Sequence, residues 1–168
     1  VAARTPCPCG NYGSRITPCR CTAQQIQRYR NRISGPMLDR IDIHVEMGEV
    51  GYNDIAGRSC GEPSSAIRAR VNAARAIQTR RYAGMGILFN AQLTNRMMNQ
   101  YCVLTSDAES LMKKAFAALK LSARAYTRLL KVSRTIADLA GSEQIKAEHI
   151  AEAIQYRSLE SKYWGEIK

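Results

Sequence analysis

The sequence is short of acidic residues, with 14 Asp and Glu against 25 Lys and Arg and a net charge of +11 over 168 residues. It has no apolar run of the roughly eighteen residues that a membrane-spanning helix needs, so we expect no membrane partner. Its first residues lack a basic segment followed by an apolar stretch, so we expect no secretory signal and a cytoplasmic location. The chain opens on Val rather than Met, which we interpret as the sign of a piece of a longer protein.

Several short catalytic motifs are also missing. The sequence contains no H-E-x-x-H, no G-x-S-x-G and no G-x-x-x-x-G-K-[ST] phosphate loop. His44 and His149 have no carboxylate or serine placed as in a catalytic triad, and we interpret both as surface or capping residues. The chain alone is therefore not expected to hold a nucleotide β-phosphate or to hydrolyse ATP.

Acids are absent from two long tracts, between Glu62 and Asp107 and between Ser110 and Ala137. Such segregation builds a positive field along one face and favours a polyanionic partner, nucleic acid or nucleotide. The alternative is a set of solvated helix faces with no specific anion. The basic residues of the tracts are Arg68, Arg70, Arg75, Arg80, Arg81, Arg96, Lys113, Lys114, Lys120, Arg124, Arg128, Lys131 and Arg134.

The hydropathy pattern predicts a mostly α fold with one strand. Strict alternation over 41–47 indicates a half-buried strand at a sheet edge. Thr22 can cap a first helix, the box of Ser106 and Glu109 another, and Ser122 the next, which Gly141 would end. We expect an α+β fragment in two parts, a remnant over 1–60 and a helical bundle over 61–168. One predicted helix begins at about residue 62 and has an apolar stripe of Ile67, Val71, Ala74 and Ile77. The other predicted helices cover 22–33, 91–101, 106–120, 122–139 and 147–158.

Four of the six cysteines fall within the first 21 residues, as the pairs Cys7-Pro-Cys9 and Cys19-Arg-Cys21. Two thiolate pairs joined by a short loop can close a tetrahedral four-thiolate zinc site. Disulfides and a hairpin of reduced thiols are the alternatives, and a cytosolic protein disfavours the disulfides. We interpret Cys102 as a core residue and Cys60 as a loop thiol.

Longer motifs carry a resemblance to a known family. The runs PCPCGNYGS, RYRNRISGPMLDRIDIHVEM, NAQL and LSARAYTRLLKVSRTIADLAGSEQIKAEHIAEAIQYR follow one another in this chain. They closely resemble the magnesium-chelatase-like AAA+ ATPases, and most of all the competence-related ComM/YifB family. The resemblance covers about residues 1–159 and implies the C-terminal part of the ATPase, namely the end of its α/β core and its helical lid. The Walker A and Walker B motifs would lie upstream.

The resemblance implies roles for individual residues. Arg40, in Leu-Asp-Arg-Ile-Asp, would be the arginine finger that reaches a neighbouring subunit's γ-phosphate, although an ion pair with Asp39 or Asp42 is the alternative. Arg124 would be sensor 2, with Arg128 a further nucleotide contact, although with Lys131 they equally suit a solvated basic face. Thr5 stands where the family carries its sensor-1 Asn, and its hydroxyl can still orient a water.

The implied function is ATP- and Mg²⁺-dependent DNA remodelling, such as branch migration during uptake and recombination of foreign DNA. The full-length protein would form a ring, expected to be hexameric. Arg28, Arg30 and Arg32 are candidate DNA contacts or, alternatively, an exposed helix face. Two other functions stay open, a magnesium chelatase subunit that inserts metal into a porphyrin and a non-enzymatic basic zinc module that binds nucleic acid.

Overall fold

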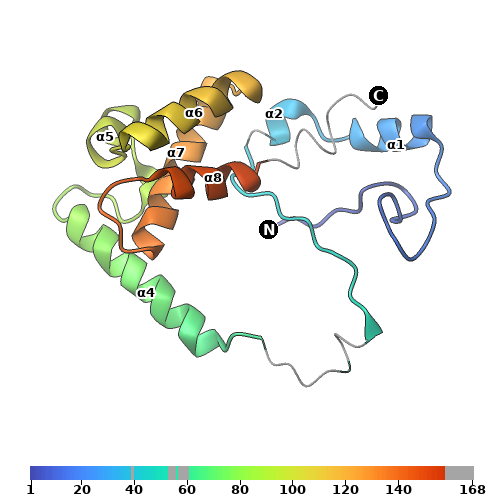
Figure 1. The fold of residues 1–168 in the computed structure, drawn as a ribbon, viewed down its shortest axis with the longest axis horizontal. Helices are drawn as coiled ribbons and strands as arrows, with labels where there is room; N and C mark the ends of the chain where they lie inside the picture. Colours follow the sequence, from blue (N-terminus) through green and yellow to red (C-terminus); the bar gives the residue numbers. More distant parts are fainter. Residues whose placement is uncertain (39, 53–55, 57–60, 158–168) are drawn as a thin grey trace. The chain divides into compact units, whose positions relative to one another are not determined.

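Two compact units make up the chain (Figure 1), in a computed structural model that describes residues 1–38, 40–52, 56 and 61–157. The first unit takes in the described residues of 1–55 together with Arg157, and the second runs from 56 to 156. The named elements of the described residues are all helices, most of them in the second unit, which confirms the mostly α fold class. The boundary predicted between residues 60 and 61 adjoins residues 57–60, which lie outside the described residues. Cys60 is one of these.

The first unit contains α1 (Ala23–Arg30) and α2 (Gly35–Leu38). Thr22 caps α1 as predicted, because its Oγ1 accepts from the Gln25 amide at 3.2 Å and Gln25 Oε1 accepts from the Thr22 amide at 2.9 Å. Ile26 of α1 and Leu38 of α2 are buried.

The strand expected over 41–47 is not formed. Among the described residues, the only β-bridge joins Leu104 to Ile145 in the second unit. Ile43, Val45 and Met47, which the alternation assigned to a buried face, are exposed. A strand needs a neighbour to complete its backbone hydrogen bonds, and the described part of the chain supplies none here.

The second unit is a helical bundle. It contains α4 (Ser64–Arg81), the 3₁₀ turn η1 (Asn90–Gln92), α5 (Asn95–Tyr101), α6 (Ser106–Ala118), α7 (Ala123–Leu139) and α8 (Ala147–Gln155). Helix α8 packs against α6 and α7, and α4 packs against α7 (Figure 1). Their apolar faces enclose one core, which includes Met112, Leu129, Ile145 and Ile150. Within the described part of the chain, no helix combines the length and apolar character needed to cross a membrane.

In the second unit the structure confirms the predicted cap of α7 but not that of α6. Ser122 caps α7, its Oγ accepting from the Ala125 amide at 3.1 Å, and Gly141 follows the helix with φ of 66°, as predicted. The cap of α6 is Thr105 rather than Ser106. The helix predicted over 91–101 divides into η1 and α5, because Thr94 caps a new helix there. Cys102 is buried in the core, as predicted.

Helix α4 is packed along only part of its length. Its predicted stripe is buried at Ala74 and half-buried at Ile77, whereas Ile67 and Val71 are 42% and 41% exposed. All residues from 64 to 73 are exposed, so the N-terminal half of the stripe stands clear of the bundle core. The hydrophobic periodicity correctly predicted the helix, but it also predicted burial of Ile67 and Val71, which are exposed.

Candidate metal centre and candidate phosphate-contacting arginines

The four N-terminal cysteines come together in the first unit. The Sγ atom of Cys7 lies 3.4 Å from that of Cys9 and 3.8 Å from that of Cys19, and Cys9 and Cys19 are 3.6 Å apart. The ligand atoms of these three and Cys21 all lie within 4.8 Å of one another. These are contacts between free thiols, because a disulfide would bring two sulfurs to about 2.05 Å.

The spacing suits a tetrahedral metal ion. Four thiolates about 2.3 Å from a zinc ion stand about 3.8 Å from one another, close to the sulfur separations found here. Backbone hydrogen bonds from Asn11 and Arg20 lower the pKa of Cys9 to about 6, whereas burial and the neighbouring thiols raise the pKa values of Cys19 and Cys21. Hydrogen bonds of this kind orient and stabilise ligands around a metal. The donor set therefore fits a four-thiolate site.

Local sequence explains how the two Cys-x-Cys pairs turn toward one another. Gly10 has φ of 86°, a conformation that favours glycine, and its amide donates to the carbonyl of Cys7 at 3.1 Å. Ser14 Oγ accepts from the amides of Ile16 and Thr17 at 3.1 and 2.8 Å, which tightens the connecting loop. The Cys21 amide in turn lies 3.5 Å from Cys19 Sγ.

Residues 1–21, here called the Cys-rich loop, contact α1 through two stacks of an arginine on a tyrosine ring. The Arg4 guanidinium lies 4.3 Å from the centre of the Tyr29 ring and donates to the Tyr29 carbonyl. The Arg30 guanidinium lies 4.6 Å from the centre of the Tyr12 ring. Each stack joins α1 to the loop, so the position of α1 depends on the fold of the loop.

Thr5, the candidate sensor-1 residue, lies in the same junction. Its hydroxyl donates to the Cys7 carbonyl at 3.1 Å and shares a hydrogen bond of 2.9 Å with the Tyr29 hydroxyl. The hydrogen bonds from Thr5 and Arg4 lower the pKa of Tyr29. Thr5 thus connects the Cys-rich loop to α1 in this structure.

The three candidate DNA-contacting arginines do not share one environment. Arg28 and Arg32 are exposed, whereas Arg30 is 4% exposed and stacks on Tyr12. The sequence grouped them because they alternate along the chain, but in a helix alternate residues point in different directions. Arg30 is a packing residue of this unit rather than part of its exposed basic face.

The candidate arginine finger lies just after α2. Arg40 is exposed, and its Nη1 donates to the carbonyl of Pro36 at 3.0 Å. The hydrogen bond curls the side chain back over the short helix. Asp39, the first of its two alternative partners, lies outside the described residues.

The three basic residues of α7 differ in their surroundings. Arg124 is exposed in the first turn, directly after the Ser122 cap, and Arg128 is half-buried one turn further along. Lys131 donates from Nζ to the carbonyl of Ala91 at 2.9 Å, which ties α7 to η1. Arg124 is therefore the most exposed of the three, at the end of α7 where the helix dipole favours an anion.

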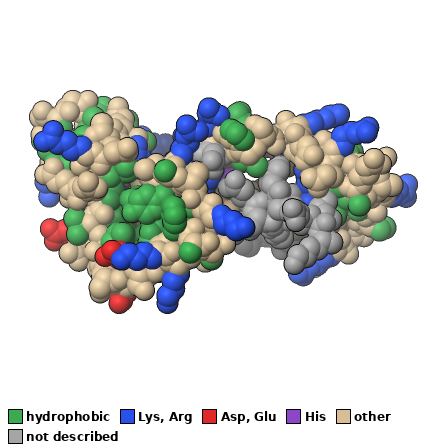
Figure 2. Space-filling view, turned by 90° about the horizontal axis from the view of Figure 1, so that it is seen from above, with side chains coloured by type: hydrophobic (Ala, Val, Ile, Leu, Met, Phe, Trp, Pro, Cys, Tyr) green, Lys and Arg blue, Asp and Glu red, His purple; other side chains and the backbone are tan. Residues whose placement is uncertain are grey.

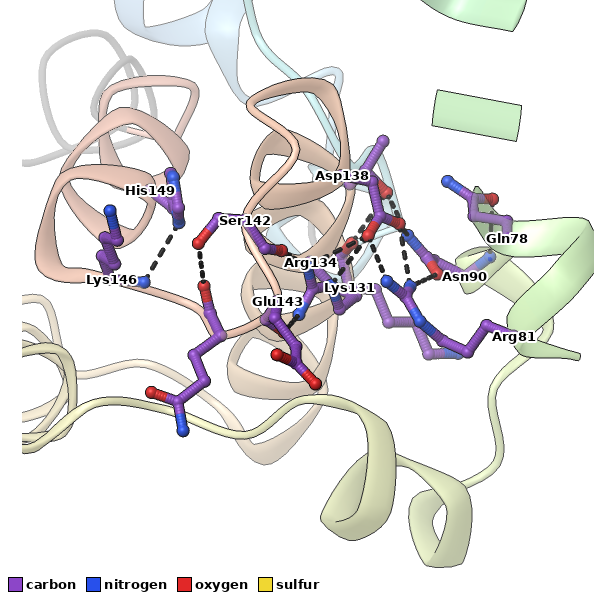
Figure 3. Close-up of polar contacts among 12 residues, drawn as sticks. Gln78, Arg81, Asn90, Lys131, Arg134, Asp138, Ser142, Glu143, Lys146 and His149 are labelled. Carbon is purple, nitrogen blue, oxygen red and sulfur yellow. Dashed lines mark hydrogen bonds and ion pairs between the residues drawn. The ribbon is translucent and has the colours of Figure 1, made fainter. Parts of the chain in front are cut away.

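A buried polar network in the bundle escaped the sequence analysis (Figure 3). Asp138, 2% exposed, accepts hydrogen bonds from Arg81, Arg134 and Asn90. Arg134, 1% exposed, also donates to the carbonyls of Ser142 and Glu143 beyond the end of α7. Two arginines counted in the basic tracts thus share one carboxylate, Arg134 within the interior and Arg81 at its edge. The signal that could have revealed the Arg134 pair is an acid four residues after Arg134 on a helix with an apolar stripe.

Other basic residues are also paired. Arg70 and Glu62 form an exposed ion pair at 2.7 Å, and Lys113 and Glu109 another at 2.8 Å. The positive tracts are therefore less uniform than the sequence suggested. Basic side chains nevertheless outnumber acidic ones on the face that Figure 2 shows.

Comparison with known proteins identifies the class to which this architecture belongs. Residues 1–55 match the model described as magnesium chelatase, subunit ChlI, and residues 61–157 match the one described as magnesium chelatase, subunit ChlI C-terminal. The chain therefore belongs to the magnesium-chelatase-like family, as its C-terminal portion, in agreement with the resemblance seen in the sequence.

Individual relatives place it further within that family. The competence protein ComM of Haemophilus influenzae is 42% identical over 160 residues, which cover 95% of this chain and 30% of that protein. The uncharacterized protein YifB of Salmonella typhimurium is 40% identical over 161 residues, 95% of this chain and 31% of YifB. The uncharacterized protein Rv2897c of Mycobacterium tuberculosis is 31% identical over 157 residues. The chain thus spans about a third of the length of these relatives.

Proposed function

We propose that this chain is the arginine-finger and lid region of an ATP-driven, ring-forming DNA-remodelling motor of the cytoplasm. Family membership and the likeness to a competence protein support the proposal. The observation that carries it is a division among the arginines. Arg81 and Arg134 form ion pairs with Asp138, whereas Arg40, which donates to the Pro36 carbonyl, and Arg124 are exposed to solvent at the two positions that resemble the family's phosphate-contacting motifs.

In this proposal ATP and Mg²⁺ bind to the upstream part of the longer protein. Arg40 reaches the γ-phosphate bound by a neighbouring subunit, and Arg124 contacts the nucleotide of its own subunit, with Arg128 beside it. A guanidinium supplied at this point stabilises the charge that develops on the transferred phosphoryl group. Branch migration of recombining DNA, driven by a hexameric ring, is the activity that fits the competence relative.

A zinc ion belongs to the same proposal as a structural element. Cys7, Cys9, Cys19 and Cys21 would hold it, and the bound ion would fix the loop that carries Thr5. The ion takes no part in ATP hydrolysis, because all four of its coordination positions are filled by protein thiolates.

Mixed rings of the full-length protein test the roles of the two arginines. Arg40→Ala should abolish ATP hydrolysis, and activity should return when this variant is mixed with subunits that keep Arg40 but have a disabled upstream phosphate loop. Arg124→Ala should also abolish hydrolysis but should not be rescued by the same partner, because sensor 2 acts within its own subunit. Full activity of the homogeneous Arg40→Ala protein would contradict the finger assignment.

The Cys cluster favours one second candidate, a zinc-bearing nucleic-acid module without motor activity. The two candidates differ in their need for nucleotide. A motor should unwind or migrate branched DNA only with hydrolysable ATP, whereas a module should bind DNA equally well without it. A magnesium chelatase subunit is distinguished by stimulation of metal insertion into a porphyrin.

A further inference from the structure

Helix α1 has one face turned toward the Cys-rich loop. Ile26 is buried, the Tyr29 hydroxyl meets Thr5, and Arg30 stacks on Tyr12. The spacing of 26, 29 and 30 places all three on one side of the helix. This inner face contacts Thr5 and Tyr12 of the Cys-rich loop.

The opposite face of α1 is polar, exposed and free of acids. Gln24, Gln27, Arg28 and Asn31 are all exposed, and Arg32 extends the same surface beyond the last turn. Gln27 Nε2 donates to Asn31 Oδ1 at 2.9 Å, so these two amides are already ordered. Residues 1–38 contain no Asp or Glu, so no carboxylate within this stretch of chain offsets Arg28 and Arg32.

The chemistry of this face suits a phosphodiester backbone. Arg guanidinium and Gln or Asn amide groups are among the common donors to nucleic-acid phosphates. Stacking on bases is disfavoured here, because one face of each nearby tyrosine ring is covered by Arg4 or Arg30. Contact through phosphates alone is insensitive to base sequence and falls steeply with salt.

Helix α1 depends on its surroundings for stability. It has eight residues, whereas an isolated helix shorter than about twelve residues is marginal in water. Tyr29 and Arg30 join it to the Cys-rich loop, and Ile26 is buried. Loss of the ion that closes the loop should therefore loosen the helix as well.

We propose that the outer face of α1, carrying Arg28 and Arg32, binds the phosphate backbone of DNA, and that it does so only when the four-cysteine site is loaded with metal. This rests on the proposed function, which supplies DNA as the partner, and adds the contact surface and its metal dependence. The four-thiolate site thereby controls DNA binding by a surface that contains none of the four cysteines.

The test uses the full 168-residue chain and a short fluorescent DNA duplex, with zinc content measured alongside the affinity. The zinc-loaded chain should bind the duplex, and removal of zinc by a chelator should weaken binding at least tenfold. Arg28→Gln with Arg32→Gln should keep zinc, lose at least tenfold in affinity, and lower the slope of log affinity against log salt by about two. Arg15→Gln with Lys146→Gln removes the same charge elsewhere and should leave the affinity within about twofold.

Each alternative outcome bears on a different claim. Equal binding by the zinc-free chain, or by the Arg28 and Arg32 variant, would overturn this inference and leave DNA binding to another surface of the proposed motor. An equal loss in the charge-matched control would reduce the effect to net charge and overturn it too. If the zinc-loaded chain binds no DNA at low salt while the full-length protein does, the inference fails alone. If neither binds, the proposed function fails with it.

Discussion

Arg81 and Asp138 lie 57 residues apart in the sequence and meet through two parallel hydrogen bonds, Nη1 to Oδ2 at 2.9 Å and Nη2 to Oδ1 at 2.5 Å. The pair joins the end of α4 to the end of α7. Asn90 adds η1 to the same group, since its Nδ2 donates to Asp138 Oδ2 at 2.8 Å and its Oδ1 accepts from the Tyr82 hydroxyl at 2.6 Å. A single carboxylate thus holds three segments of the bundle together.

Asp138→Asn should destabilise the bundle by about 3–5 kcal/mol, because it leaves the guanidinium groups of Arg81 and Arg134 in the interior without a counter-charge. Urea unfolding followed by circular dichroism measures the change. Glu143→Gln removes an exposed acid near the end of the same helix and should cost less than about 0.5 kcal/mol. Similar unfolding midpoints for the two variants would show that the buried network contributes little.

Cys19→Ser should abolish tight zinc binding, because three thiolates remain and a serine hydroxyl is a poor replacement for the fourth. Metal analysis of the purified chain measures the loss. Cys102→Ala is the matched control, since burial raises the pKa of that core thiol to about 11 and keeps it protonated. Retention of full zinc content by the Cys19 variant would exclude the four-thiolate site.

The sequence predicted those features that short-range patterns encode. The caps at Thr22 and Ser122 depend on contacts three residues away, and the Cys pairs depend on a tight turn at Gly10, so their local sequences were sufficient. The Arg81–Asp138 pair was missed because nothing local joins residues so distant in the sequence. The strand over 41–47 failed for a related reason, since alternation shows that a segment suits a sheet but not that a partner strand is present.

The grouping of Arg28, Arg30 and Arg32 shows a further limit. Charge counting treats the three alike, whereas the helix turns Arg30 onto Tyr12 and the other two toward solvent. Composition predicted a basic surface, but the assignment of each arginine to packing or to the surface required the fold.

Stability of the bundle should fall as pH drops below about 6.5, through His149. Burial lowers the pKa of His149 below its usual value of 6.5, an effect opposed by Glu148 and Glu152 and assisted by Lys146 and Arg134. The unfolded chain therefore takes up a proton first, and the stability present above pH 6.5 is lost as pH falls toward the lowered pKa.

A substitution isolates this effect. His149 Nδ1 accepts from the Lys146 amide at 3.0 Å at the start of α8, and the chain uses Gln25 for the same purpose in α1. His149→Gln should preserve the cap and flatten the dependence of unfolding free energy on pH below about 6.5. A pH profile unchanged by the substitution would assign the acid sensitivity to other groups.

The 168-residue chain by itself should hydrolyse no ATP, because it lacks the phosphate loop that holds the nucleotide. Phosphate release by the purified chain, with and without DNA, measures this. Turnover that survives further purification and disappears in Arg124→Ala would contradict the prediction, since it would place a complete catalytic site within the chain.

Lys120 lies just beyond α6 with φ of 48°, a left-handed conformation that favours glycine. The turn it makes is closed by a hydrogen bond from the Leu121 amide to the Phe116 carbonyl at 3.2 Å. Lys120→Gly should therefore stabilise the bundle, by about 0.5–1 kcal/mol. Lys114→Gly replaces an exposed lysine inside α6 and should instead destabilise it by about 1 kcal/mol. Thermal unfolding of the two variants measures both changes, and a loss of stability in Lys120→Gly would mean that the lysine side chain makes a favourable contact that outweighs its backbone strain.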